Sequence, residues 1–201
     1  MSPCVRIVPT GVANVASVVA ALRRLGATVD VAADAATVRR AERVVLPGVG
    51  ACGAAAAAID AQGLRQALRE RVDAGRPTLA ICLGLQLLAA ASDESPGVAG
   101  LGVVPATARR FPTGVRVPQL GWNTVAPAPG SPLPGGVAYF ANSYRLEVVP
   151  PGWHGLVSDH GGPFVAAFAR AGVLACQFHP ELSGAYGAGL LRRWLVGAEV
   201  V

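Results

Sequence analysis

Short apolar runs alternate with helix-like segments in the first half of the chain, and this alternation limits the possible fold more than any other feature. Runs typical of buried strands are expected at residues 5–8, 27–31, 43–46 and 78–81. The helix-like segments between them lie at residues 15–25, with Asn14 as the helix N-cap, and at 54–74, with a break near Gly63. Strands linked by helices form a parallel sheet that is covered on both faces. We therefore expect an α/β fold with a mostly parallel central sheet flanked by helices.

The segment around residues 102–168 has a different character. It is rich in proline and glycine, and its β-rich stretches lie at residues 121–125, 137–140 and 164–168. We interpret it as antiparallel strands and loops that are added to the parallel core. A further buried strand is expected at 173–178 and a closing helix at 189–196. A chain of 201 residues with no linker-like stretch predicts a single domain over residues 1–201.

Composition excludes several classes of function. The chain contains no lysine, so it has neither a phosphate-binding Gly-Lys-Ser/Thr loop nor a lysine that could hold pyridoxal phosphate, and we expect no cofactor. Its arginines occur in scattered pairs, which argues against a nucleic-acid partner despite the net charge of +5. Four cysteines without a Cys-x-x-Cys pair indicate neither a metal site nor a disulfide framework. No run is long enough for a membrane span and no signal peptide is evident, so a cytoplasmic location is expected.

Cys82 lies where the apolar run 78–81 enters a turn of small residues. A residue at a sharp strand-to-helix turn is exposed, and the next backbone N–H, here that of Leu83, is free to stabilise an oxyanion. Ala80 and Gly84 supply the small neighbours that such a turn needs, and residues 84–91 are the expected helix. The other cysteines, at positions 4, 52 and 176, are interpreted as small buried hydrophobic residues. Cys82 is therefore the candidate nucleophile.

His179 and Glu181 follow the last expected strand, with Pro180 between them. Residues two apart on an extended strand point to the same side, so Glu181 is expected to hold the His179 imidazole in one tautomer. These residues are the candidate base and its orienting carboxylate. His-Pro-Glu alone is a weak signal, and its weight comes from the combination with Cys82.

The loop Pro47–Gly50 directly follows a strand. In a parallel sheet it lies at the same edge as the Cys82 turn, so Val49 and Gly50 are expected to complete an oxyanion hole together with Leu83. An ordinary strand-to-helix turn is the alternative if the loop is considered alone.

Three motifs together resemble the class I (triad) glutamine amidotransferases, an α/β family with a flavodoxin-like sheet. They are Leu-Pro-Gly-Val-Gly at 46–50, Ile-Cys-Leu-Gly-Leu-Gln-Leu-Leu at 81–88 and Gln-Phe-His-Pro-Glu at 177–181. Two further segments, Val-Pro-Gln-Leu-Gly-Trp-Asn at 117–123 and Tyr-Phe-Ala-Asn-Ser-Tyr at 139–144, are similar to the glutaminase subunits of imidazole glycerol phosphate synthase. The resemblance covers nearly the whole chain.

The resemblance implies that Cys82 hydrolyses L-glutamine to glutamate and ammonia through a thioester. It assigns substrate binding to Gln86, Glu94, Ser143 and Tyr144, of which the acidic Glu94 suits the α-ammonium group of glutamine. Without the family, Gln86 would be read as a helix-surface amide and Glu94 as an exposed loop acid. The family also implies a heterodimer with a (β/α)8-barrel cyclase subunit, which receives the ammonia and forms imidazole glycerol phosphate in histidine biosynthesis. Residues 118–123 and 142–144 are candidates for the contact surface.

The chain departs from the family at three places. The opening loop, residues 9–14, keeps only part of the usual motif, Ala80 replaces a glycine, and Leu182 replaces a lysine after His-Pro-Glu. Alternatives that remain open are another triad amidotransferase subunit, such as the one that supplies pyridoxal phosphate synthesis, a stand-alone γ-glutamyl hydrolase, and a non-catalytic regulatory subunit.

Overall fold

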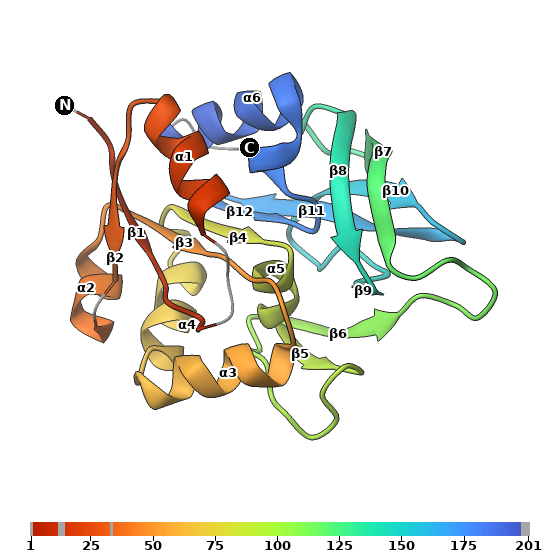
Figure 1. Cartoon of the computed structure of the whole chain (residues 1–201), viewed down its shortest axis with the longest axis horizontal. Coiled ribbons are helices and arrows are strands. Elements are labelled where there is room, and N and C mark those ends of the chain that lie inside the picture. Colours follow the sequence, from red (N-terminus) through yellow and green to blue (C-terminus); the bar gives the residue numbers. More distant parts are fainter. Residues whose placement is uncertain (1, 12–14, 33, 198–201) are drawn as a thin grey trace.

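A nine-stranded mixed sheet forms the centre of the computed structural model, which describes residues 2–11, 15–32 and 34–197. The strand order is β2-β1-β3-β4-β12-β11-β10-β7-β8 (Figure 1). The first five of these strands are mutually parallel, as the alternating pattern predicts. Their bounds are β1 Cys4–Ile7, β2 Thr28–Val31, β3 Arg43–Leu46, β4 Thr78–Ile81 and β12 Val173–Cys176.

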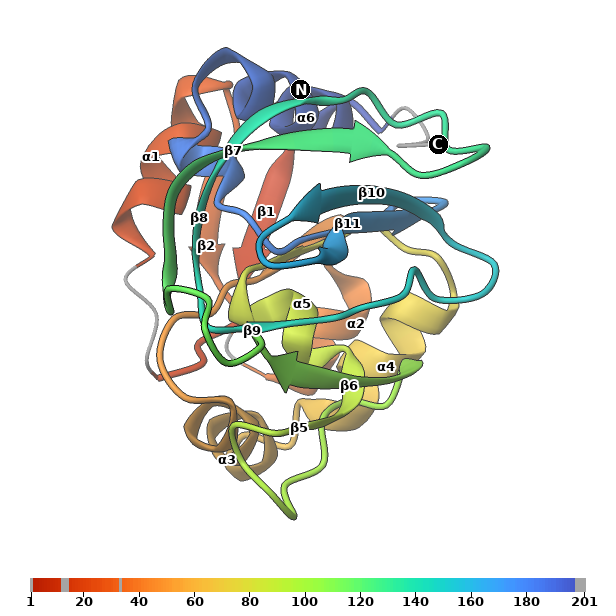
Figure 2. The same cartoon turned by 90° about the vertical axis from the view of Figure 1, so that its right-hand side faces the viewer.

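The other four strands of this sheet are antiparallel to their neighbours, and β11 pairs in antiparallel fashion with β12. The large sheet continues through β11 Pro163–Arg170, β10 His154–Asp159, β7 Gln119–Pro127 and β8 Gly136–Asn142. A separate three-stranded sheet contains β5 Ala89–Ser92, β6 Val104–Arg110 and β9 Tyr144–Arg145, and Figure 2 shows it beside the antiparallel half. The prediction of antiparallel strands added to a parallel core is confirmed.

Helices cover both faces of the sheet (Figure 1). Two apolar cores result, one on each face. On one face α1 Ala16–Arg24 and α6 Gly184–Leu195 pack on the sheet through Leu22, Leu191 and Trp194. On the other face lie α2 Ala35–Arg40, α3 Cys52–Ala61, α4 Arg65–Asp73 and α5 Leu83–Leu87. The strands β3 and β4 are fully buried, which is why they are apolar without alternation.

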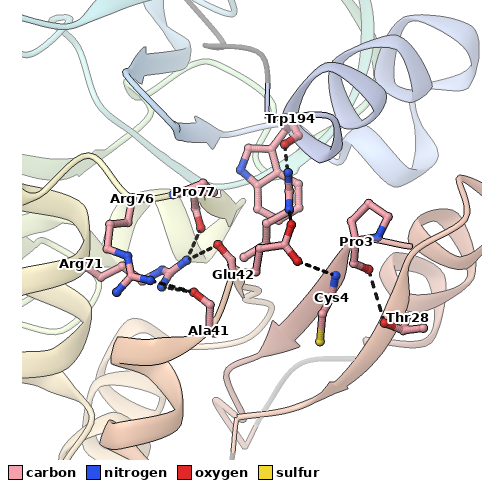
Figure 3. Close-up of polar contacts among 10 residues, drawn as sticks. Pro3, Cys4, Thr28, Ala41, Glu42, Arg71, Arg76, Pro77 and Trp194 are labelled. Atoms are coloured by element: carbon pink, nitrogen blue, oxygen red, sulfur yellow. Dashed lines mark hydrogen bonds and ion pairs between the residues drawn. The ribbon is translucent and has the colours of Figure 1, made fainter. Parts of the chain in front are cut away.

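Arg71 forms hydrogen bonds at the end of the sheet where the parallel strands begin. Its guanidinium donates to the carbonyl oxygens of Ala41, Glu42 and Pro77 (Figure 3). It also donates to the Val38 carbonyl and to the Thr78 hydroxyl. Burial lowers the pKa of Arg71 to about 10, so the side chain stays cationic at neutral pH. Next to it the nearly buried Arg43 donates to the Trp194 carbonyl and pairs with Glu42. These contacts join α2, β3, α4 and α6 at one end of the molecule.

Several sequence expectations need correction. Helix α2 was not predicted, because only Val38 of its six residues is buried and the apolar signal is weak; its N-cap Asp34 accepts from the Thr37 N–H. The helix expected at 84–91 ends at Leu87, and Ala89–Ser92 is strand β5, paired with β6. The closing helix begins at Gly184, earlier than expected. Asn14, the expected N-cap of α1, lies outside the described residues, and the structure begins that helix at Ala16. In the described part of the chain, no helix is long and apolar enough to cross a membrane.

Candidate active site

Cys82 occupies a strained turn between β4 and α5. Its backbone has φ 54° and ψ −108°, in a region that residues with a side chain rarely adopt. The turn is tight because α5 approaches the end of β3: a Cβ atom at Gly84 would lie 2.1 Å from the Leu46 carbonyl oxygen. Only glycine fits there. The expected elbow is therefore formed, and the backbone strain is located at the candidate nucleophile.

His179 and Glu181 meet directly, although not in the way expected. His179 Nδ1 lies 2.8 Å from Glu181 Oε1, and the two side chains are 9% and 5% exposed. The expectation of an extended strand is wrong, since residues Pro180–Leu182 form a 3₁₀ turn. Pro180 begins this turn, and the Ser183 hydroxyl and the Leu182 N–H both donate to the His179 carbonyl. The turn, rather than strand alternation, brings the carboxylate to the imidazole.

The imidazole of His179 is strongly favoured in its charged form. Burial alone lowers its pKa, but hydrogen bonds and charge interactions with Cys82 and Glu181 exceed this effect and raise the pKa from 6.5 to about 10. Of the two Glu181 oxygens, Oε1 faces His179, and Oε2 has no hydrogen-bond partner within the described residues. An imidazolium between a cysteine and a carboxylate is the arrangement that activates a thiol for attack.

A cavity of about 170 Å³ opens above Cys82. Except for Glu181, which lies behind the imidazole, every site residue predicted from the sequence lines it. The lining residues are Val49, Gly50, Cys82, Leu83, Gln86, Glu94, Ala141, Asn142, Ser143, Tyr144 and His179. These residues come from five separate parts of the chain, and the carboxyl ends of neighbouring parallel strands bring several of them together. A larger cavity, of about 320 Å³, lies elsewhere, between β6 and residues 147–151, and contains none of them.

One of the expected oxyanion donors, the Leu83 N–H, is not free in this conformation. The Leu83 N–H donates to the carbonyl oxygen of Gly48 at 3.3 Å, so that carbonyl occupies the donor expected to stabilise an oxyanion. The two backbones approach closely here: a Cβ atom added at Gly48 would lie only 2.5 Å from the Leu83 Cβ atom. Gly50, two residues further along the same loop, has a φ of 92°. The candidate nucleophile is thus in its expected turn, whereas the Leu83 N–H of the expected oxyanion hole is occupied.

Two side-chain amides support the nucleophile, and the sequence assigned only one of them. Gln86 donates to the Tyr144 carbonyl and to Gln177 Oε1, both at 3.0 Å, so it lies inside the site and not on a helix surface. Gln177 in turn lies 3.7 Å from Cys82 Sγ through its Nε2. Gln177 was present in a quoted motif but was given no role. Gln177 lies two residues before His179 in the sequence, and this spacing could have indicated that both side chains face the site.

Glu94 and the remaining cysteines also have defined surroundings. Glu94 Oε2 accepts the Cys52 N–H at 2.7 Å, which anchors the carboxylate at the cavity wall and makes the exposed-loop reading wrong. Burial, together with the charge of Glu94, raises the pKa of Cys52, and burial with Glu181 raises that of Cys176. Both thiols are thereby kept neutral, as expected of structural cysteines. The described residues contain no group of His, Cys, Asp and Glu side chains suited to a metal ion.

Comparison with known proteins agrees with this geometry. Residues 7–198 match the family described as glutamine amidotransferase class-I. The chain is 42% identical to the imidazole glycerol phosphate synthase subunit HisH of Symbiobacterium thermophilum, with 94% of this chain and 91% of that protein covered. It is 41% identical to HisH of Deinococcus radiodurans, covering 94% and 92% of the two chains.

The chain belongs to the class-I glutamine amidotransferases, in the HisH family. Solved structures agree on the fold. A crystal structure of a glutamine amidotransferase superposes with a TM-score of 0.74 at 21% identity, covering 96% of this chain and 99% of that one. The PurLQS structure from Thermotoga maritima gives 0.70 at 16% identity, with 98% of each chain covered. The α/β amidotransferase fold expected from the three motifs is therefore confirmed.

Proposed function

We propose that this HisH-family chain is the glutaminase subunit of an imidazole glycerol phosphate synthase and that Cys82, His179 and Glu181 are its catalytic triad. The observation that carries the proposal is the strained Cys82 turn in one cavity with His179, whose imidazole lies 2.8 Å from Glu181. The reaction is the hydrolysis of L-glutamine to glutamate and ammonia, without a cofactor or metal.

The chemistry needs two successive displacements. Cys82 Sγ attacks the carboxamide carbon of glutamine, and a C–S bond forms as the carbonyl electrons move to oxygen. When the C–N bond breaks, His179 gives its proton to the leaving nitrogen, which departs as ammonia. A water that His179 deprotonates then attacks the thioester carbon, the C–S bond breaks, and glutamate leaves. Glu181 holds the imidazole in place through both steps.

The substrate's charged end is assigned to the wall opposite the triad. Glu94 faces the α-ammonium group, and the backbone of Ser143 and Tyr144 faces the carboxylate end. Gln86 supports this wall because its amide donates to the Tyr144 carbonyl. Each of these residues lines the same cavity as Cys82.

Activity requires a change in the loop 47–50. As long as Gly48 accepts the Leu83 N–H, the oxyanion that forms on the substrate has no donor there. We propose that Val49 and Gly50 complete the hole with Leu83 after this contact opens, and that the isolated chain is consequently nearly inactive.

The cyclase partner is assigned to an apolar surface beside the active site. Leu120 and Trp122 on β7 are 66% and 59% exposed, and Val137, Val49 and Leu182 are also exposed. Trp122 packs edge-on against Tyr139, whose carbonyl accepts the His179 N–H at 2.9 Å. A (β/α)8-barrel cyclase bound here as a heterodimer would contact residues within one hydrogen bond of the triad, and ammonia would pass across this surface. With Leu182 in place of lysine, the contact at that position is apolar. We place the complex in the cytoplasm and treat residues 1–201 as one domain.

The deciding experiment measures glutamine hydrolysis by the full chain alone, with the cyclase subunit of the same organism, and with the cyclase and its nucleotide substrate. Stimulation by the partner and its ligand that is lost in Cys82→Ala supports the synthase assignment and the nucleophile together. Activity that is independent of the cyclase would move the chain to another triad amidotransferase or a hydrolase. Absence of activity in every mixture would favour a regulatory subunit.

A further inference from the structure

The cavity above Cys82 carries an unbalanced set of charges. Glutamine brings an ammonium and a carboxylate, and the lining supplies Glu94 for the former. Among the described residues that line the cavity there is no arginine, and the only other ionisable groups are Cys82, Tyr144 and His179. Cys82 and His179 lie at the reacting end, and Tyr144 carries no positive charge. The carboxylate therefore has no full positive charge within the lining itself.

Arg110 lies directly behind this wall. In the antiparallel pair β6–β9, Arg110 stands opposite Tyr144, so the two side chains share one face of the small sheet. The Arg110 guanidinium carbon lies 6.0 Å from the centroid of the Tyr144 ring. Tyr144 is itself fixed, since its carbonyl accepts from both Gln86 and Asn142 at 3.0 Å. A cation is thus held over a residue of the cavity wall.

The neighbouring arginines are occupied by carboxylates, whereas Arg110 is not. Arg109 lies 3.8 Å from both Asp93 and Glu147. Arg145 is nearly buried, pairs with Glu147 at 3.2 Å and lies over the Phe111 ring. Within the described part of the chain, no acidic side chain lies in ion-pair distance of Arg110. Its positive charge therefore has no acidic partner among these residues.

We propose that Arg110 is a positioning residue that attracts the α-carboxylate of glutamine and so favours free amino-acid substrates over uncharged amides. This inference rests on the proposed function and adds a residue outside the cavity lining to the recognition of its substrate. Because the side chain is exposed, we expect the effect on binding to be about two- to five-fold at low ionic strength. It should shrink as salt is raised, because exposed charges are screened over about 10 Å at 0.1 M salt.

Two reagents that alkylate Cys82 separate this effect from a general change in the site. The chloroketone analogue of L-glutamine carries the charged amino-acid end, and chloroacetamide lacks it; with each, the thiolate forms a C–S bond and chloride leaves. The full chain is treated with each reagent, and the second-order rate of Cys82 modification is measured by mass spectrometry. Neither measurement requires a completed oxyanion hole or the cyclase.

The variants are Arg110→Gln, Arg110→Lys and the control Arg109→Gln, which removes the same charge one residue away on the opposite face of the strand. We expect Arg110→Gln to slow the chloroketone about two- to five-fold and to leave chloroacetamide unchanged, with most of the rate restored in Arg110→Lys. Arg109→Gln should change neither rate. Equal slowing of both reagents, slowing of neither, or the same selective effect in Arg109→Gln overturns the role of Arg110. If the chloroketone modifies Cys82 of the wild-type chain no faster than it modifies the free thiol of Cys4, the proposed function fails as well.

Discussion

In the candidate active site, the half that contains the triad residues is already formed, whereas the half expected to form the oxyanion hole is not. The triad half rests on the buried neighbours β4 and β12, and it already contains the Cys82 turn and the 2.8 Å His179–Glu181 contact. The oxyanion half rests on the loop after β3, where the Gly48 carbonyl occupies the Leu83 N–H. In the proposed mechanism, nucleophile activation is therefore a property of the core, and oxyanion stabilisation is a property of a loop. A partner can control such an enzyme by moving the loop alone.

The largest expected effect tests the core half. Replacing Cys82 by alanine should reduce partner-stimulated glutamine hydrolysis by at least about 10⁴-fold, because no other group in the cavity can form the thioester. Cys4→Ser is the matched control, since Cys4 is a free cysteine remote from the cavity. Steady-state ammonia release measures both variants. Residual hydrolysis within about tenfold of the wild type would exclude Cys82 as the nucleophile.

Glu181→Gln tests how far the core half depends on charge. The amide can keep a hydrogen bond near His179 but cannot stabilise the imidazolium, so we expect kcat to fall about 10²-fold with KM little changed. Glu70→Gln, an exposed residue of α4, should leave both constants unchanged. If KM rises while kcat is retained, Glu181 acts on the substrate and not on His179.

Gly48→Ala tests the loop half. The added methyl would meet Leu83 Cβ at 2.5 Å and the Gly84 nitrogen at 2.8 Å, so the loop must move away from the Cys82 turn. The displaced loop opens the Gly48–Leu83 contact but also keeps Val49 and Gly50 too far from Leu83 to complete the hole, so we expect partner-stimulated kcat to fall about tenfold. Alkylation of Cys82 by chloroacetamide should remain within about twofold of the wild type, because the triad is untouched. Gly189→Ala in α6, where an added Cβ meets nothing within 4 Å, is the control. A parallel loss of alkylation would show that the two halves are not separable.

The last prediction concerns stability and pH. Because the pKa of His179 is raised from 6.5 to about 10 on folding, the folded chain binds the extra proton between these values. The stabilisation is complete below about pH 6.5 and is lost as pH rises towards 10, with a slope of at most about 1.4 kcal/mol per pH unit. Urea unfolding of the wild type and of His179→Gln across this range measures it. The difference in free energy of unfolding between the two proteins should narrow as pH rises, and a constant difference would contradict the assigned ion pair.

Sequence reasoning reached the core half more fully than the loop half. The buried strands and the motifs around Cys82 and His179 carry strong local patterns, and both groups lie where expected. The engaged Leu83 N–H could not be predicted, because a contact between one loop carbonyl and the first amide of α5 leaves no trace in residue types. The 3₁₀ turn at Pro180 could not be predicted because a strand and a turn both place residue 181 on the same side as residue 179. The spacing of the two residues therefore does not distinguish a strand from a turn. Helix α2 and strand β5 are short and packed by tertiary contacts, which outweigh their weak periodicity.

The backbone at Cys82 has a consequence for how this chain tolerates change. A φ of 54° with a side chain costs about 1–3 kcal/mol, and glycine would adopt the same turn without that cost. Cys82→Gly is therefore a mutation that relaxes the protein while it removes the nucleophile. A screen for thermal stability without an assay for activity would select against catalysis at this one position, so engineering of the chain has to keep the two measurements together.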